Sequence, residues 1–190
     1  MATIGNGHRV ALLVVDVQVG VVRAAWDVSR VVANVAATVW RARAQGVPVI
    51  WVQHEDEDLM PGCGDWQWVP ELVPVEGETR IHKRFNSSFE QTALEAELAA
   101  QGVTHVVLAG AMTNWCIRAT AYAALERGFD LTLVGDAHTT ASIALEGGGA
   151  IEAAHLVQDL NIAVQRLNYP GRRNATVRAA AVDFSRPPGD

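Results

Sequence analysis

The feature that most constrains the fold is a series of short, almost uniformly apolar runs separated by segments with helical periodicity. A strand with one wet face alternates apolar and polar residues, whereas a strand buried on both faces is apolar throughout. The runs at residues 9–18, 48–54, 103–110 and 130–137 are of the second kind. Their alternation with helical segments predicts an α/β fold with a mostly parallel central sheet flanked by helices.

The intervening segments have the apolar spacing of amphipathic helices. Ser29 is placed to cap the first helix, and Ser88 with Gln91 three residues later forms a capping-box pattern that predicts the start of the second. Two further helices are expected at about 116–127 and 150–167. The segment that follows them, "ATVRAAAVDF", fits either an edge strand or an arm.

Composition limits the organisation of the chain and its partners. With 190 residues, of which 49 % are hydrophobic, the chain suits one domain, expected at 1–184, followed by a disordered tail at 185–190. A net charge of −6 leaves no broad basic surface for nucleic acid, and no apolar run is long enough to cross a membrane. The two cysteines, Cys63 and Cys116, are expected to be free thiols in a soluble, cytoplasmic protein.

Three ionisable side chains occupy equivalent places in this architecture. Asp16 ends the first predicted strand, Lys83 ends the short strand predicted at 79–85, and Cys116 follows the strand that ends at Gly110. In open α/β sheets, ligands bind outside the carboxyl ends of the strands. The three side chains are therefore expected to converge, although they lie far apart in the sequence.

Each of the three residues also has a purely structural interpretation. A single cysteine is more often an inert core residue, Asp16 could cap the turn after its strand, and Lys83 could be a surface charge. A combined role is favoured because a thiol at a helix start beside an ammonium has a lowered pKa, which predicts an accessible thiolate near neutral pH. A neighbouring carboxylate could take the thiol proton and return it to a leaving group.

Three stretches carry a family resemblance: "LLVVDVQ", "HKRFNSSFEQTALEAEL" and "AGAMTNWCIRATAYAALERGFDLTLVGDA". Through them nearly the whole chain resembles the isochorismatase-like cysteine hydrolases. This superfamily of Rossmann-like α/β enzymes includes nicotinamidases, carbamoyl-group and other amide hydrolases, and isochorismatases. The resemblance implies a single-domain three-layer sandwich that acts on a small molecule and forms a homo-oligomer, a dimer or a tetramer.

The resemblance also implies roles for individual residues. Asp16, Lys83 and Cys116 would form the catalytic triad, and the peptide between Ala111 and Met112 would be cis. The backbone N–H groups of Met112 and Cys116 would form an oxyanion hole. The implied reaction is cleavage of a C–N bond in an amide, carbamoyl compound or lactam through a thioester.

The sequence is also compatible with other activities and with a structural role. An isochorismatase-type vinyl-ether hydrolase would need Asp16 as an acid but no thiol, and a scaffold protein would need neither. Nicotinamidase activity is a further alternative. Metal-dependent nicotinamidases have an Asp-x-His pair, whereas His54 and Asp56 stand in the reverse order, so no metal or other cofactor is expected. The C-terminal stretch resembles that of hydrolases that open the lactam of streptothricin antibiotics.

Aromatic and histidine side chains near the predicted strand ends are candidates for the substrate pocket. The irregular segment 55–74 is typical of a lid or pocket wall, although it could simply cover the core. His138 could point into the site or make a structural hydrogen bond. The full set of candidate pocket residues, with core or subunit packing as the alternative, is His54, Trp66, Phe85, Trp115 and His138.

Overall fold

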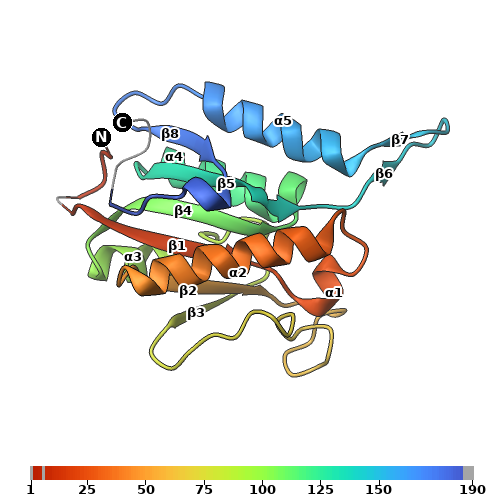
Figure 1. The fold of residues 1–190 in the computed structure, drawn as a ribbon, viewed down its shortest axis with the longest axis horizontal. Coiled ribbons are helices and arrows are strands. Elements are labelled where there is room, and N and C mark those ends of the chain that lie inside the picture. Colours follow the sequence, from red (N-terminus) through yellow and green to blue (C-terminus); the bar gives the residue numbers. More distant parts are fainter. Residues whose placement is uncertain (1, 6, 186–190) are drawn as a thin grey trace.

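The computed structural model describes residues 2–5 and 7–185, and it contains a six-stranded sheet in the order β3-β2-β1-β4-β5-β8 (Figure 1). Every neighbouring pair in this sheet is parallel, which confirms the predicted fold class. Of the predicted tail, only Ser185 lies within the described residues. The strands are β1 (Arg9–Val15), β2 (Val49–His54), β3 (Thr79–Lys83), β4 (Val103–Ala111), β5 (Asp130–Thr139) and β8 (Asn174–Val177).

Helices cover both faces of the sheet, and a small hairpin projects away from its end (Figure 1). None of the helices in the described part of the chain is long and apolar enough to span a bilayer. The helices are α1 (Val19–Val22), α2 (Val28–Ala44), α3 (Leu94–Ala100), α4 (Arg118–Glu126) and α5 (Ala153–Arg166). The shorter elements are the π-helical turn η1 (Thr113–Ile117), the 3₁₀ turn η2 (Ala179–Ala181) and the hairpin strands β6 (Ile143–Ala144) and β7 (Ala150–Ile151).

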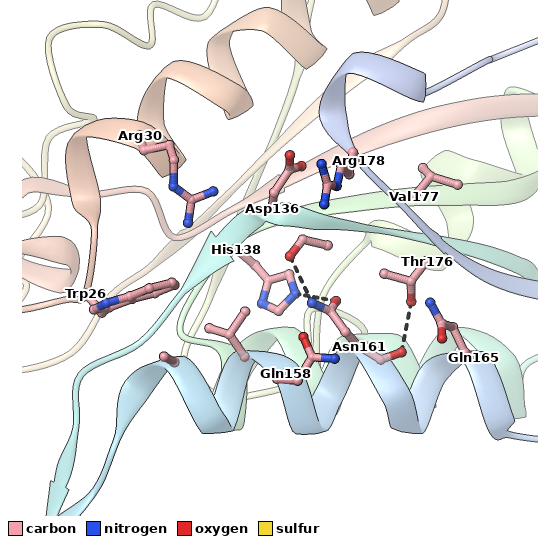
Figure 2. Close-up of a pocket in the computed structure, with 13 residues that line it drawn as sticks. Trp26, Arg30, Asp136, His138, Gln158, Asn161, Gln165, Thr176, Val177 and Arg178 are labelled. Carbon is pink, nitrogen blue, oxygen red and sulfur yellow. Dashed lines mark hydrogen bonds between the residues drawn. The ribbon is translucent and has the colours of Figure 1, made fainter.

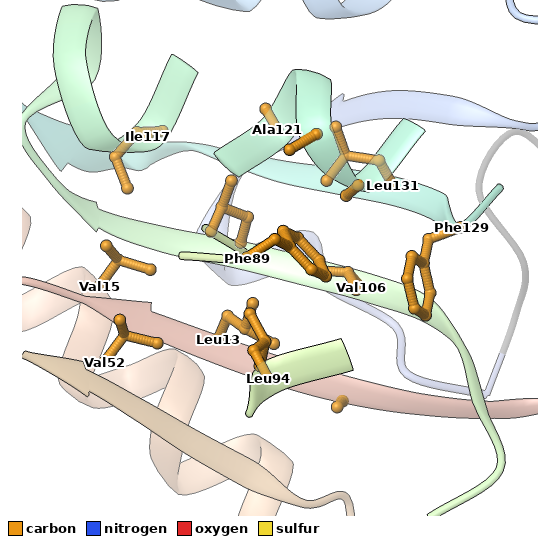
Figure 3. Close-up of a cluster of buried hydrophobic side chains, with 14 of the residues drawn as sticks. Leu13, Val15, Val52, Phe89, Leu94, Val106, Ile117, Ala121, Phe129 and Leu131 are labelled. Atoms are coloured by element: carbon orange, nitrogen blue, oxygen red, sulfur yellow. The ribbon is translucent and has the colours of Figure 1, made fainter. Parts of the chain in front are cut away.

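Alternate residues of β1 enter two separate hydrophobic cores. Leu13 packs in the core that contains Leu94 of α3 and Ala121 of α4, as Figure 3 shows. Leu12 packs in the opposite core, with Val35 of α2. Because successive side chains of a strand point to opposite faces, an uninterrupted apolar run is what a central strand of a three-layer structure requires.

The direction in which the chain adds strands to the sheet changes at β1. From β1 the chain builds β2 and β3 on one side, then crosses to add β4, β5 and β8 on the other. Connections leaving the carboxyl ends of β1 and β4 therefore diverge and leave room for a ligand. Asp16, Lys83 and the turn that carries Cys116 all lie at this edge.

Two predicted helix starts are wrong. Helix α2 has Asp27 at its N-cap instead of Ser29, and α3 begins at Leu94, beyond the predicted capping box. The Ser88 hydroxyl instead lies 2.9 Å from the Thr120 hydroxyl of α4, and the Ser88 N–H donates to that same oxygen. Ser88 is fully buried, so this tertiary contact replaces the local capping interaction.

The connection between β2 and β3 covers part of the core and also lines a cavity. The Trp68 ring packs edge-on against the buried Trp51, with centroids 5.0 Å apart, so part of the connection covers the core. Another part forms the wall of an open cavity of about 450 Å³ next to the end of β2, lined by Glu55, Asp56, Glu57, Met60, Pro61 and Arg84.

Candidate active site

Asp16 follows β1 and is held in the interior by backbone geometry. Its φ of 53° is left-handed, and its N–H donates to the Val52 carbonyl oxygen at 2.8 Å. The residue is 1 % exposed, and its Oδ2 lies 2.6 Å from the ammonium nitrogen of Lys83. A strained backbone and a buried charge are both unfavourable, and together they are typical of a functional site.

Lys83 is the last residue of β3, and its ammonium is the centre of the cluster. Besides Asp16, Nζ contacts the Phe85 carbonyl oxygen at 3.1 Å, His54 Nδ1 at 3.2 Å and Cys116 Sγ at 3.2 Å. The side chain is fully buried. A buried ammonium requires acceptors for its N–H groups, and this site supplies them from the backbone and from three side chains.

Cys116 lies in η1, directly after β4. The residue is 8 % exposed, compared with 1 % for Asp16. Its thiol donates to Asn86 Oδ1 at 3.8 Å. The turn is closed by the N–H groups of Trp115 and Ile117, which both donate to the Met112 carbonyl, and the Ala111–Met112 peptide is cis.

The electrostatics of the cluster differ from the expectation for Cys116. Burial, together with the negative charge of Asp16, raises the pKa of Cys116 to about 12, although Lys83 opposes the shift. The expectation of a thiolate near neutral pH is therefore wrong. Burial also raises the pKa of Asp16, again against the opposing charge of Lys83. The cluster thus combines a neutral thiol with a carboxylate whose proton affinity is increased.

The raised pKa of Cys116 has a consequence for stability at high pH. Between the unfolded pKa near 9 and the folded pKa of about 12, only the folded protein keeps the thiol proton. The free energy of unfolding should therefore fall with rising pH in this window, by about 1.4 kcal/mol per pH unit. Urea denaturation at pH 8, 9 and 10 should show that wild type loses more stability than Cys116→Ala. A constant difference between the two proteins would contradict the raised pKa.

The other candidate pocket residues differ in their contacts and in their exposure to solvent. His54 contacts Lys83 directly, whereas Phe85 does so through its backbone and is 44 % exposed as a residue. Trp115 neighbours Cys116 in η1 and is 52 % exposed. The Trp66 ring packs edge-on against His82, with centroids 5.5 Å apart.

His138 lies in a second cavity, of about 420 Å³, between β5 and α5 (Figure 2). Its Nδ1 lies 2.8 Å from the Thr113 hydroxyl and its Nε2 lies 3.0 Å from Asn161 Oδ1. Complete burial lowers its pKa to about 4, so the ring is neutral at pH 7. With both nitrogens paired to protein groups, His138 has the geometry of a structural hydrogen-bonding residue that supports the start of η1.

Potential metal ligands also meet at the triad. Among the described residues, the ligand atoms of Asp16, His54 and Cys116 lie within 4.8 Å of one another. The Lys83 ammonium contacts all three side chains, so a metal ion bound by them would have to displace it. The three side chains as arranged surround the side-chain ammonium of Lys83, and this arrangement does not fit a bound metal ion.

Two polar residues of the site were missed by the sequence analysis. The Gln18 side chain accepts from the His54 N–H at 2.8 Å and donates to the His54 carbonyl oxygen at 3.0 Å, which fixes the end of β2. Asn86 accepts from the Cys116 thiol. The available signals were a polar residue two places after Asp16 in an apolar run, and an amide three places after Lys83.

The chain matches known proteins over much of its length. The family model described as the isochorismatase domain matches residues 10–158. A streptothricin hydrolase of Streptomyces noursei is 39 % identical over 142 residues, which cover 70 % of this chain and 50 % of that protein. This chain thus spans about half the length of that relative.

In two further matches, the aligned region covers a larger share of the other protein. A ureidoacrylate amidohydrolase of Enterobacter sp. (strain 638) is 30 % identical over 167 residues, covering 66 % of this chain and 71 % of the relative. The crystal structure of an isochorismatase from Pseudomonas putida KT2440 superposes with a TM-score of 0.83 at 27 % identity and covers 94 % of both chains.

Proposed function

Because the chain belongs to the isochorismatase domain family, we propose that it is a cysteine hydrolase that cleaves a carbon–nitrogen bond of a small molecule. The substrate class is an amide, a carbamoyl compound or a lactam. One observation carries the proposal: the ammonium of Lys83 lies 2.6 Å from the Asp16 carboxylate and 3.2 Å from the Cys116 sulfur, inside a buried site. This arrangement joins a nucleophile, a base and a fixed counter-charge.

The first half of the reaction forms a thioester. Asp16 takes the Cys116 proton as the sulfur attacks the substrate carbonyl carbon, so the C–S bond forms and the carbonyl electrons move to oxygen. The N–H groups of Met112 and Cys116 stabilise that oxyanion. Asp16 then gives its proton to the nitrogen as the C–N bond breaks, and the amine or ammonia departs.

The second half releases the product acid. Asp16 takes a proton from water as the water oxygen attacks the thioester carbonyl. The C–S bond breaks, and the proton returns to sulfur. Because the pKa of Cys116 is raised to about 12, the proton leaves the sulfur only as the sulfur attacks. The raised pKa of Asp16 favours this shuttle, because a carboxyl group transfers protons best when its pKa approaches the working pH.

Several properties of the working enzyme belong to the same proposal. We place it in the cytoplasm as a single-domain homo-oligomer that uses no metal or other cofactor and binds neither membranes nor nucleic acid. The free thiols of Cys63 and Cys116 support a reducing location. The negative net charge argues against nucleic acid.

A vinyl-ether hydrolase of the isochorismatase type is the second candidate. The observation that favours it is the raised pKa of the buried Asp16, which suits a group that must protonate a carbon atom of the substrate. This reaction would not require the thiol of Cys116. The two candidates therefore differ in which side chain is indispensable.

A screen of small primary amides, carbamoyl compounds, lactams and isochorismate tests the proposal. We expect release of ammonia, amine or acid from at least one C–N substrate. Cys116→Ala and Asp16→Ala should both abolish this activity, and a mass increase from an acyl group should appear in wild type alone. Activity on isochorismate that survives Cys116→Ala and is lost in Asp16→Ala would instead establish the vinyl-ether reaction. Undiminished amide hydrolysis by Cys116→Ala would overturn the thioester mechanism.

A further inference from the structure

We propose that His54 is a positioning residue that directs the Lys83 ammonium toward Asp16 and Cys116, and that Asp56 fixes the tautomer of His54 needed for this. The proposal rests on the function proposed above, since it assigns a role at that same site. It begins from the contacts of Lys83, whose ammonium carries three N–H groups and lies near four acceptor atoms.

The chemistry of an ammonium determines where the His54 proton is. Lysine can only donate, so His54 Nδ1, which lies 3.2 Å from Lys83 Nζ, must offer a lone pair. In a neutral ring the single N–H is then on Nε2. That atom lies 3.1 Å from Asp56 Oδ2, which accepts from it.

Asp56 is itself held in the form that enforces this tautomer. Its Oδ1 accepts from the N–H groups of Asp58 at 2.9 Å and Leu59 at 2.8 Å. Although partial burial opposes the effect, these two N–H groups, together with His54, lower the pKa of Asp56. An ionised carboxylate only accepts hydrogen bonds, so it requires a proton on the facing His54 nitrogen.

The ring of His54 lies between the exposed loop and the buried triad. Its side chain is 18 % exposed, compared with 46 % for Asp56 and none for Lys83. Gln18 donates to the His54 carbonyl oxygen and accepts from the His54 N–H, and these two hydrogen bonds fix the base of the side chain. The chain of contacts Asp56–His54–Lys83 thus ties the acidic loop after β2 to the groups that carry out the reaction.

The tautomer can be measured without any substrate. In protein labelled with ¹⁵N at histidine, the chemical shifts of the His54 ring at pH 8 should show a proton on Nε2 and a bare Nδ1, assigned by comparison with His54→Asn. Asp56→Asn should increase the population of the other tautomer, because an amide can also donate. Asp58→Asn changes a nearby acid whose side chain makes no hydrogen bond or ion pair with His54 within the described structure, and it should leave the ring unchanged. An N–H on Nδ1 in wild type would overturn the proposal.

Kinetics then separate positioning from substrate binding. His54→Leu removes the acceptor, so kcat should fall by about 100-fold with little change in KM, as for a misplaced catalytic group. His54→Asn places an amide oxygen near the position of Nδ1 and should recover part of the loss. Unchanged kcat in His54→Leu, or a change confined to KM, would contradict a positioning role. Because the NMR arm needs no turnover, it still decides the tautomer if the proposed reaction fails.

Discussion

Replacing Lys83 by methionine is expected to reduce kcat/KM for the C–N substrate by about 100- to 10,000-fold, the contribution of an oriented general base. Methionine fills much of the same space but leaves Asp16 in a buried site without its counter-ion. The pKa of that carboxyl group, which burial already raises, should then rise further, so Asp16 becomes protonated and cannot accept the thiol proton. Steady-state kinetics with the substrate found in the screen measures the effect.

The same variant should lose stability, and a neighbouring residue provides the control. Removing one partner of a buried ion pair costs about 3–5 kcal/mol, which urea denaturation of Lys83→Met at pH 8 should reveal. The loss should be smaller at pH 5, because the unfolded chain ionises Asp16 less as the pH falls toward its ordinary pKa, so keeping the buried carboxyl protonated costs less. Arg80→Met changes an exposed cation of the same strand and should alter neither quantity. Retention of full activity by Lys83→Met would contradict the assigned triad.

Gly110→Ala should cause the largest loss of stability in the sheet. Gly110 pairs with Val15 across the central strands β4 and β1 and has a φ of 132°. A Cβ at this position would lie 2.0 Å from the Val15 carbonyl oxygen and 2.8 Å from the Val15 nitrogen, which are backbone atoms in the middle of the sheet. We expect a loss above about 4 kcal/mol, a large part of the stability of a domain.

The loss should be visible as a lower urea midpoint and a weaker near-ultraviolet circular dichroism signal. Because Val15 immediately precedes Asp16, any folded fraction should also have reduced activity. Gly147→Ala is the matched control, since a Cβ there meets nothing within 4 Å and its φ lies outside the left-handed range. A Gly110→Ala protein as stable as Gly147→Ala would show that the two strands can separate at little cost.

The central strands were predictable because their burial on both faces leaves a continuous apolar signal. The β1 run and the β4 run are apolar regardless of their neighbours, and both were found at nearly the predicted positions. Convergence of Asp16, Lys83 and Cys116 followed from the rule that parallel strands end at one edge of the sheet. These conclusions depend on the local pattern of apolar residues and on the order of strands and helices, and both can be inferred from a single sequence.

The remaining features depend on contacts between distant residues. Ser88 matches a helix cap in sequence, but the hydroxyl of Thr120 competes successfully for it in the fold. The pKa of Cys116 is set by the balance between burial, Asp16 and Lys83, and the sequence shows only that these charges exist. The His54 tautomer likewise follows from the direction of one hydrogen bond, which no sequence pattern records.

The connection between β2 and β3 and the groups of the triad come from different parts of the fold. Asp16, Lys83 and Cys116 are fixed by strand ends and by the turn after β4, whereas the open cavity next to the end of β2 is lined largely by residues 55–61. Loop sequences can therefore diversify without disturbing the sheet. The tether from Asp56 through His54 to Lys83 sets a limit on that freedom, because a loop exchanged for another must still supply a carboxylate at this point. The loop thus has one position, Asp56, at which a change would reach the catalytic groups through His54.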